Sequence, residues 1–202
     1  ADARAFTAIM HRTWREQLVP ELAKAGVEFR ETRQLGPGHQ RWIESYFQKQ
    51  IYPILTPLAV DPAHPFPVLL NKSLNLVVLL LDPRQPRRTY RMAVVQVPRT
   101  LPRILRLPEL DGQRGYVFTA DVVQANLREL FPGLEVVHAS TFRVTRDSNL
   151  EVDEVQGTDL MSSIEKELVK RRRGEPVRLE IDHGAHPDVI DRFQKAFGLE
   201  SD

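Results

Sequence analysis

The chain of 202 residues contains no cysteine, so disulfides, thiolate zinc sites and thiol nucleophiles are excluded. No apolar run approaches the roughly 20 residues that a membrane-spanning helix needs, and no basic-then-apolar leader occurs. The glycine spacing of a P-loop and the Gly-rich turn of a dinucleotide-binding fold are also missing. These absences predict a cytoplasmic protein without a transmembrane segment, while peripheral association with a membrane stays open.

The charge balance gives little support to a nucleic-acid partner. The formal net charge is +1 at pH 7, and counterion release at nucleic acids needs a clear surplus of cations. Arginine outnumbers lysine by 22 to 6, and the guanidinium fork suits the recognition of phosphate and carboxylate groups. A genome with GC-rich codons accounts for the same bias, so the arginine content does not by itself identify a partner.

Prolines crowd residues 53–67, which run directly into an apolar stretch. Each proline fixes φ, removes a backbone donor and pushes the preceding residue toward extended geometry. We therefore expect a pinned, non-helical loop over residues 53–67, followed by a buried strand over residues 74–81. Polar side chains stand between the two, where a rigid scaffold often presents binding groups; they are Asn71, Lys72, Ser73 and Asn75.

Helical periodicity predicts helices at the start of the chain. Apolar residues recur at helical spacing from residue 6 to about residue 19, the pattern continues to residue 25, and Gly26 ends it. A weak alternation over residues 27–33 predicts a short strand. A second apolar stripe over residues 42–51 predicts a helix with a packed core face that stops at Pro53.

The rest of the chain mixes strands and helices. Residues 74–81 and 92–97 flank a turn signal and predict an antiparallel hairpin. Further strands are expected at 116–118, 136–145 and 177–181. Helices are expected at 119–130, with Thr119 as a cap, from about residue 160 to an end at Gly174, and at 187–197, with Pro187 in the first turn. The pattern indicates an α+β fold, in which a mostly antiparallel sheet carries packed helices on one face and follows the N-terminal helices.

Three motifs in this order resemble a known family. The first contains Leu55-Thr56-Pro57, Asp61-Pro62 and His64-Pro65-Phe66-Pro67, followed by Asn71, Ser73, Leu74 and Asn75. The second, residues 142–147, ends in Thr-Arg-Asp, and the third, residues 177–180, reads Val-Arg-Leu-Glu. Together they span most of the chain and resemble the head (middle) domain of the polyphosphate kinase family.

The resemblance implies a fragment of an ATP:polyphosphate phosphotransferase. In that family the terminal phosphate of ATP passes to polyphosphate through a histidine in C-terminal domains, so no catalytic residue is expected in this chain. ATP and magnesium are implied for the parent enzyme, with no cofactor or metal in this fragment. Residues 1–35 then correspond to the end of the N-terminal helical domain and residues 36–202 to the head domain. The head domain is expected to support the architecture of the enzyme, to contact its remaining domains and to take part in forming a homodimer. The first residue, Ala1, also suggests a piece of a longer protein.

Candidates for phosphate contact come from the motifs. Arg143 and Arg146 stand on the predicted strand of residues 136–145 and its end, three positions apart, so an ideal strand points them to opposite faces unless a bulge intervenes. We prefer Arg146, with Asp147 able to orient its fork. Asn71 and Lys72 form the second pair of candidates. The alternative for Arg146 is a purely structural role in the adjoining turn. The alternative for Asn71 and Lys72 is that they are solvated residues at the start of a strand and contact no ligand.

Other clusters leave alternatives open. An arginine-rich turn would attract polyanions, including polyphosphate, although such a turn is more often a solvated hairpin tip; its members are Arg84, Arg87, Arg88 and Arg91. A free-standing polyanion-binding module is therefore the alternative function. His183 and His186 stand three apart near two aspartates, but we expect a turn into a helix there rather than a metal site.

Overall fold

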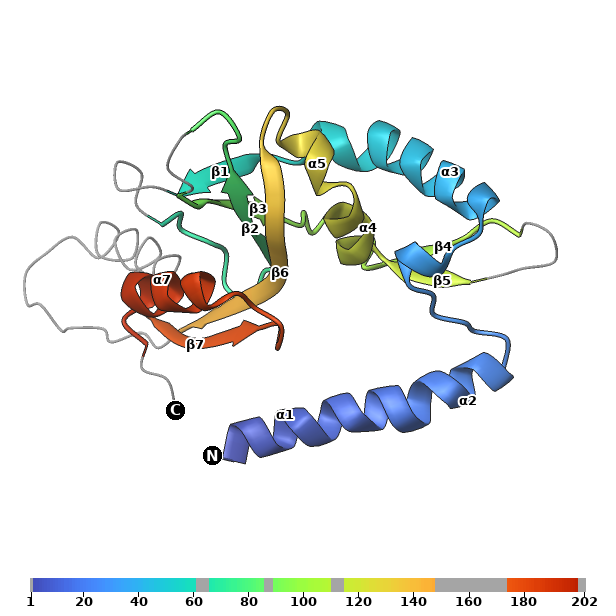
Figure 1. The fold of residues 1–202 in the computed structure, drawn as a ribbon. Coiled ribbons are helices and arrows are strands. Elements are labelled where there is room, and N and C mark those ends of the chain that lie inside the picture. Colours follow the sequence, from blue (N-terminus) through green and yellow to red (C-terminus); the bar gives the residue numbers. More distant parts are fainter. Residues whose placement is uncertain (1, 61–65, 86–88, 110–114, 148–173, 200–202) are drawn as a thin grey trace, which may run out of the picture. The chain divides into compact units, whose positions relative to one another are not determined.

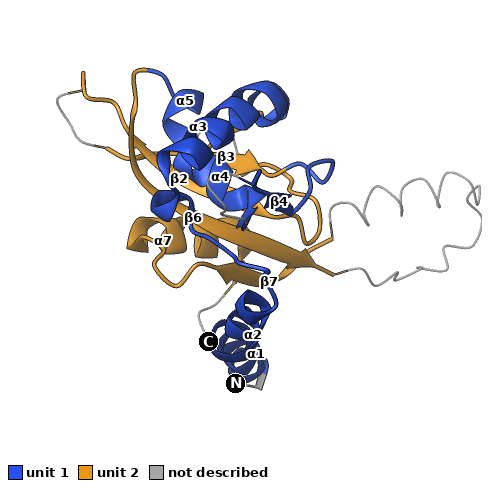
Figure 2. Ribbon diagram, turned by 90° about the vertical axis from the view of Figure 1, so that its right-hand side faces the viewer, with its two compact units in different colours: residues 1–55, 98–132, 202 blue, residues 56–97, 133–201 orange. Residues whose placement is uncertain are grey.

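The computed structural model describes residues 2–60, 66–85, 89–109, 115–147 and 174–199. Figure 1 draws the fold coloured along the sequence. Contacts divide the chain into two compact units, which Figure 2 colours separately: unit 1 with residues 1–55, 98–132 and 202, and unit 2 with residues 56–97 and 133–201. The predicted boundary after residue 35 remains a prediction, because these units group residues by contact and not by homology. None of the described helices is both long and apolar enough to cross a bilayer.

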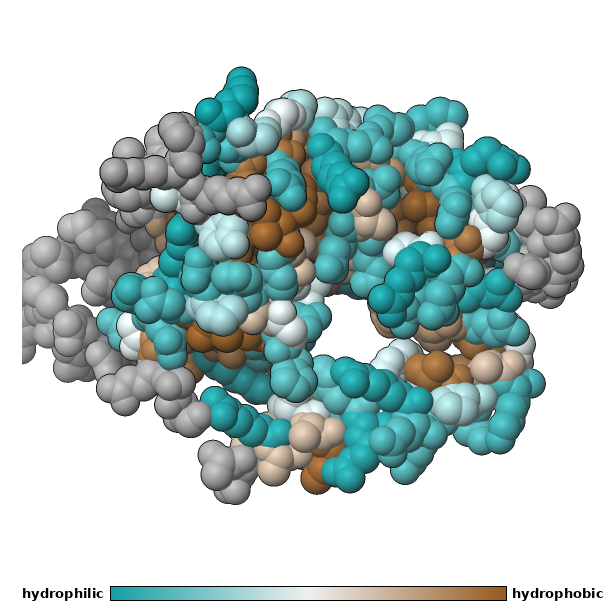
Figure 3. All heavy atoms as spheres, in the orientation of Figure 1, coloured by the Kyte–Doolittle hydropathy of each residue, from teal (hydrophilic) through white to brown (hydrophobic). Residues whose placement is uncertain are grey.

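Unit 1 begins with a continuous helical segment. It comprises α1 (Asp2–Thr13), the π-helical turn η1 (Trp14–Leu18) and α2 (Val19–Lys24), and Gly26 ends it with a φ of +81°. The predicted helix and its end are therefore confirmed. Several of its apolar side chains are exposed, as the brown atoms among hydrophilic ones show in Figure 3; they are Phe6, Ile9, Met10 and Leu18.

The second predicted helix is also present. It runs through α3 (Pro37–Tyr46) and η3 (Phe47–Ile51). The predicted core face is confirmed for Ile43, Phe47 and Ile51, which are buried, whereas Trp42 and Tyr46 of the same stripe are only partly buried. One further 3-10 turn, η4 (Tyr52–Ile54), includes Pro53. The prediction of a non-helical backbone from residue 53 was therefore wrong by one turn, because a proline near the start of a turn has no N–H to lose from it.

The remainder of unit 1 differs in part from the prediction. The strand β5 (Tyr116–Phe118) and the helices α4 (Thr119–Ala125) and α5 (Leu127–Leu130) were expected. The partner strand β4 (Ile104–Arg106) was not expected, because its sequence Ile-Leu-Arg shows no alternation of apolar and polar residues, and pairing with β5 defines it. Residues 27–33 form no strand: Phe29 makes a single bridge to Tyr116, and η2 (Thr32–Gln34) follows. Thr119 does not cap its helix, since its hydroxyl donates to the carbonyl oxygen of Pro102.

Unit 2 contains a five-stranded sheet in the order β1-β3-β2-β6-β7, in which all neighbours are antiparallel. Its strands are β1 (Pro57–Val60), β2 (Asn75–Leu81), β3 (Arg91–Gln96), β6 (Glu135–Arg146) and β7 (Pro176–Ile181). The predicted α+β class and hairpin are confirmed. The strand β1 was not predicted; Pro57 is its first residue and β1 lies at the sheet edge, the position where a strand tolerates proline.

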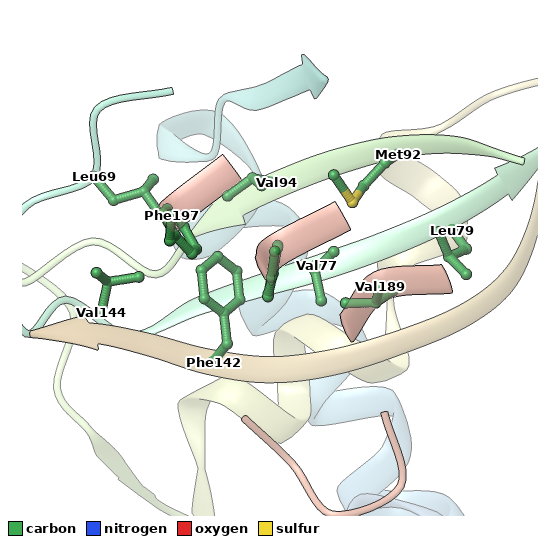
Figure 4. Close-up of a cluster of buried hydrophobic side chains, with 10 residues drawn as sticks. Leu69, Val77, Leu79, Met92, Val94, Phe142, Val144, Val189 and Phe197 are labelled. Carbon is green, nitrogen blue, oxygen red and sulfur yellow. The ribbon is translucent and has the colours of Figure 1, made fainter. Parts of the chain in front are cut away.

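The helix α7 (Pro187–Phe197) covers one face of this sheet. Its residues Val189, Phe193 and Phe197 pack in one cluster with side chains of β2, β3 and β6 (Figure 4). The strand β2 is buried at every residue, so side chains on both of its faces lie away from solvent. The expectation of a sheet covered on one face is therefore wrong for β2, whose continuous apolar sequence is typical of a strand buried on two sides. The helix predicted from about residue 160 lies outside the described residues as far as residue 173.

Replacing Phe193 with alanine should lower the free energy of unfolding by about 3–5 kcal/mol, because a large side chain with no exposed surface leaves a cavity. Its ring centroid lies 4.6 Å from that of Phe142 and 5.3 Å from that of Phe66, so several contacts are lost together. Urea unfolding followed by circular dichroism measures the change. Ile190→Ala is the control on the same helix: its residue is 39% exposed, and an equal loss for both variants would contradict this packing.

Candidate functional site

Asn71 and Arg146 lie together although they are far apart in the sequence. The backbone N–H of Arg146 donates to Asn71 Oδ1 at 2.9 Å, and Asn71 Nδ2 donates to the Arg146 carbonyl oxygen at 3.4 Å. Next to this pair, the N–H of Lys72 donates to the Val144 carbonyl oxygen at 2.9 Å. The loop before β2 is thereby fastened to the end of β6. We call this arrangement the loop–strand clasp; its residues are Leu69, Asn71, Lys72, Val144 and Arg146.

The Arg146 side chain completes the clasp. Its Nε donates to the Leu69 carbonyl oxygen at 3.3 Å, and its Nη1 donates to the Gly174 carbonyl oxygen at 2.8 Å. Loss of water around the half-buried guanidinium lowers the pKa of Arg146 below its ordinary value. Gly174 is required at its position, because a Cβ there would lie 2.1 Å from the carbonyl oxygen of Asp147. The guanidinium thus joins three segments of unit 2: the loop before β2, the end of β6 and the segment before β7.

The polar residues that follow Lys72 hold the start of β2. Both Ser73 and Asn75 have no exposed surface. The Ser73 hydroxyl lies 2.8 Å from the Leu70 carbonyl oxygen, and Asn75 Nδ2 donates to the Ser73 carbonyl oxygen at 2.9 Å. Polar groups buried at a strand start need such partners, because an unpaired one is costly to bury. The Asn-x-Ser-Leu-Asn motif therefore has a direct local role in fixing this turn.

Arg143 lies apart from the clasp. It pairs across the strands with Glu180 on β7, and its Nε is 3.4 Å from Glu180 Oε2. Arg178 Nη2 lies 3.4 Å from the other oxygen of the same carboxylate. A register shift does occur between Thr145 and Arg146, yet Arg143 and Arg146 keep different hydrogen-bond partners. Of the four phosphate candidates, the structure brings together Asn71, Lys72 and Arg146, and their phosphate contact stays a prediction.

His138 on β6 finds two hydrogen-bond partners in the folded chain. The N–H of His186 donates to His138 Nε2 at 3.2 Å, and the Ser140 hydroxyl lies 2.6 Å from the same nitrogen. Burial lowers the pKa of His138, the neighbouring His186 lowers it further, and Asp182 opposes them. His186 also accepts from the N–H of Asp188 through Nδ1 at 3.2 Å and so caps α7, as its place before Pro187 indicated. The described residues contain no group of three or more potential metal ligands.

The arginine-rich turn is partly neutralised. Arg84 Nε lies 3.0 Å from Asp82 Oδ1, and Arg91 Nη2 lies 3.8 Å from Asp82 Oδ2. The hydrogen bonds from Arg84 hold the pKa of Asp82 below its usual range. Arg87 and Arg88 lie outside the described residues, Arg84 and Arg91 share one carboxylate, and the polyanion-binding alternative stays a prediction.

Unit 1 has a hollow whose apolar part is formed by Leu35 and Ile43 and whose polar lining includes Arg33 and Glu44. Burial raises the pKa of Asp121 on α4, and the charge of Glu31 raises it further. Sequence reasoning missed this acid, because nothing in its local pattern marks a carboxyl that becomes partly buried through tertiary packing.

Known proteins resemble this chain over most of its length. Residues 38–202 match the family model described as the polyphosphate kinase middle domain. The polyphosphate kinase of Neisseria meningitidis serogroup C (strain 053442) is 42% identical over 181 residues, covering 89% of this chain and 26% of that protein. That of Xylella fastidiosa (strain 9a5c) is 40% identical over 193 residues, covering 94% and 28%. The chain therefore spans about a quarter of the length of the curated relatives it matches.

A solved structure shares the fold. The crystal structure of polyphosphate kinase from Porphyromonas gingivalis aligns with a TM-score of 0.75 and 24% sequence identity, covering 94% of this chain and 26% of that chain. The match extends to the mixed helices and antiparallel sheet predicted from the sequence.

Replacing Arg146 with alanine should lower the free energy of unfolding by about 1–3 kcal/mol, because two charge-assisted hydrogen bonds to backbone carbonyls are lost. Arg143→Ala is the matched control. It removes a 49% exposed partner of a surface ion pair, for which a loss of roughly 0–1 kcal/mol is expected. Urea unfolding of both variants measures the difference, and equal losses would argue against a structural role for Arg146.

Stability should fall with acid through His138. Its pKa in the folded chain lies below the ordinary value of 6.5, so the unfolded chain takes up a proton first as the pH falls. The contribution of neutral His138 to the free energy of unfolding is complete above pH 6.5. It is lost as the pH falls toward the folded-state pKa, because protonated Nε2 cannot accept a hydrogen bond from the His186 N–H. His138→Gln keeps an acceptor without titrating there. Urea midpoints between pH 7.5 and 5 should decrease more for the original chain, and parallel curves would contradict the assignment.

Proposed function

This chain belongs to the polyphosphate kinase family, in the part described as its middle domain, and on that premise we propose that it is an architectural head domain. The proposed parent enzyme reversibly transfers the terminal phosphate of ATP to polyphosphate through a phosphohistidine outside this chain. The chain itself carries out no turnover. It supports the reaction by holding the domains that do.

The observation that carries the proposal is the loop–strand clasp. Three of its residues, Asn71, Val144 and Arg146, belong to motifs that resemble the family, and Asn71 and Arg146 hydrogen-bond backbone groups of distant segments. A side chain that fastens backbone segments to one another contributes to the rigidity of the domain. Rigid supports hold reacting groups in productive geometry, so a domain built this way suits a scaffold for chemistry located elsewhere.

We further infer the setting of the parent enzyme from the family. The head domain takes part in forming a homodimer, and the other domains of the same protein are its partners. ATP and magnesium bind to those domains, the parent carries the phosphorylated histidine, and the enzyme works in the cytoplasm with peripheral membrane association still open.

The 202-residue chain incubated with ATP and magnesium should make no polyphosphate above a protein-free blank, whereas the full-length enzyme should make it. The physical reason is that the phosphorylated histidine lies outside this chain. The reaction is measured as incorporation of radiolabelled phosphate from ATP into polyphosphate. Sedimentation equilibrium of the same preparation measures self-association. Synthesis by the 202-residue chain alone would refute the proposal.

The same preparation tests the polyanion-binding alternative. A module that binds through the arginine-rich turn should bind polyphosphate tightly without self-association, and Arg84→Ala should weaken that binding in a salt-dependent way. The architectural proposal expects Arg84→Ala to bind as the original chain does, because Asp82 already neutralises this guanidinium.

A further inference from the structure

Lys72 has an unusual backbone conformation. Among the described residues it is the non-glycine residue with a positive φ, at +57°. A side chain in this left-handed region meets the neighbouring carbonyl oxygen, so glycine and asparagine adopt it more readily than lysine does. A lysine held in this conformation by its surroundings is the kind of strained position that occurs at ligand-contacting sites.

The residues around Lys72 fix that conformation. The Lys72 N–H donates to the Val144 carbonyl oxygen at 2.9 Å, and the preceding Asn71 side chain is fastened to the Arg146 backbone. On the other side, the Ser73 N–H donates to the Leu70 carbonyl oxygen at 3.0 Å, and Ser73 has no exposed surface. The Lys72 side chain is exposed. The ammonium therefore extends into solvent from a turn whose backbone is held on both sides.

The clasp also differs in charge from other cationic positions in unit 2. Lys195 lies 2.7 Å from Asp191, Arg84 lies 3.0 Å from Asp82, and Arg143 lies 3.4 Å from Glu180. In the clasp, Arg146 donates to carbonyl oxygens, which satisfy its hydrogen bonds without cancelling its charge. Within the part of the chain that the structure describes, no carboxylate forms an ion pair with Lys72 or Arg146. The clasp thus carries the charges of an exposed lysine and a half-buried arginine that no carboxylate among the described residues pairs with, which favours an anionic ligand.

We propose that the loop–strand clasp is an anion-binding site in which the Lys72 ammonium contacts phosphoryl oxygens of a polyphosphate chain. Arg146 adds to the positive potential, and Asn71 is a positioning residue. An ammonium is a compact charge with three rotatable donors, so it can follow oxygens that repeat along a flexible phosphate chain without the planar fit that a guanidinium needs. The choice of polyphosphate as the ligand rests on the proposed function.

The test is the affinity of the 202-residue chain for inorganic tripolyphosphate, measured by isothermal titration calorimetry at 50 mM and 200 mM salt. Lys72→Asn removes the charge, and asparagine tolerates a positive φ, so this variant should unfold at the same or a higher urea concentration than the original chain. Its affinity should fall roughly tenfold, the size of one charge-assisted hydrogen bond. The slope of log affinity against log salt should decrease by about one for the lost contact.

Two controls separate the contact from general effects of charge. Lys195→Gln removes one positive charge from α7, where Asp191 already pairs with it, and should leave the affinity unchanged. Lys72→Arg keeps the charge and should retain most of the binding. If Lys72→Asn binds tripolyphosphate as tightly as the original chain, or if the original chain does not bind it, the proposal is wrong.

A parallel titration with ATP distinguishes the sources of the phosphoryl groups. Binding of tripolyphosphate alone assigns the site to the inorganic chain, and equal loss of both ligands in Lys72→Asn assigns it to the triphosphate group that they share. Both outcomes support an anion site at Lys72. These measurements record binding and involve no turnover. The outcome of the synthesis assay, which tests the architectural proposal, therefore does not affect the result for the anion site.

Discussion

The loop–strand clasp is the constraint on which the organisation of unit 2 depends. Leu69 and Val144 each contribute a carbonyl oxygen to the clasp, and their side chains belong to the buried cluster under α7 (Figure 4). The same backbone positions therefore take part in the polar clasp and in the apolar core. A shift of the loop relative to β6 would break hydrogen bonds and expose core side chains together, which makes the arrangement cooperative.

The charged residues separate into two groups by the partners they find. The side chains of Arg84 and Arg143 are exposed and pair with the carboxylates of Asp82 and Glu180, and solvent and salt weaken an ion pair whose cation is exposed. Arg146 is half-buried and donates to backbone carbonyls, so its charge persists while its donors hold the fold. The abundance of arginine in the sequence thus has several local causes, and composition alone could not identify which cation remains available to a ligand.

Local patterns predicted the long elements and the short strand β5, and the elements that they missed are all short. The helical stripe ending at Ile51, the hairpin of β2 and β3, and the amphipathic helix α7 each contain enough residues for their period to be visible. The strand β4 has three residues and takes its identity from pairing with β5. Thr119 has the residue type of a cap, but its hydroxyl finds the carbonyl oxygen of Pro102 instead. In both cases a partner distant in the sequence determines the structure: β5 for the strand β4, and Pro102 for the Thr119 hydroxyl.

The candidate site was predictable by residue type and not by geometry. Asn71, Lys72 and Arg146 stood out as polar residues at the ends of expected strands, but nothing local indicated that the Asn71 amide would meet the Arg146 backbone. Arg143 lies apart from the loop–strand clasp because it is paired with Glu180 in the register of β6 and β7.

The sequence by itself determined the family, the α+β class and the buried strand β2, because motifs and periodicity are properties of neighbouring residues. The loop expected over residues 53–67 instead contains part of η4 and the strand β1. Only the tertiary structure decided which charges are neutralised, which polar side chains fasten the fold and where Lys72 stands. Those outcomes depend on distances and burial between segments, and long-range contacts leave no signature in the local pattern.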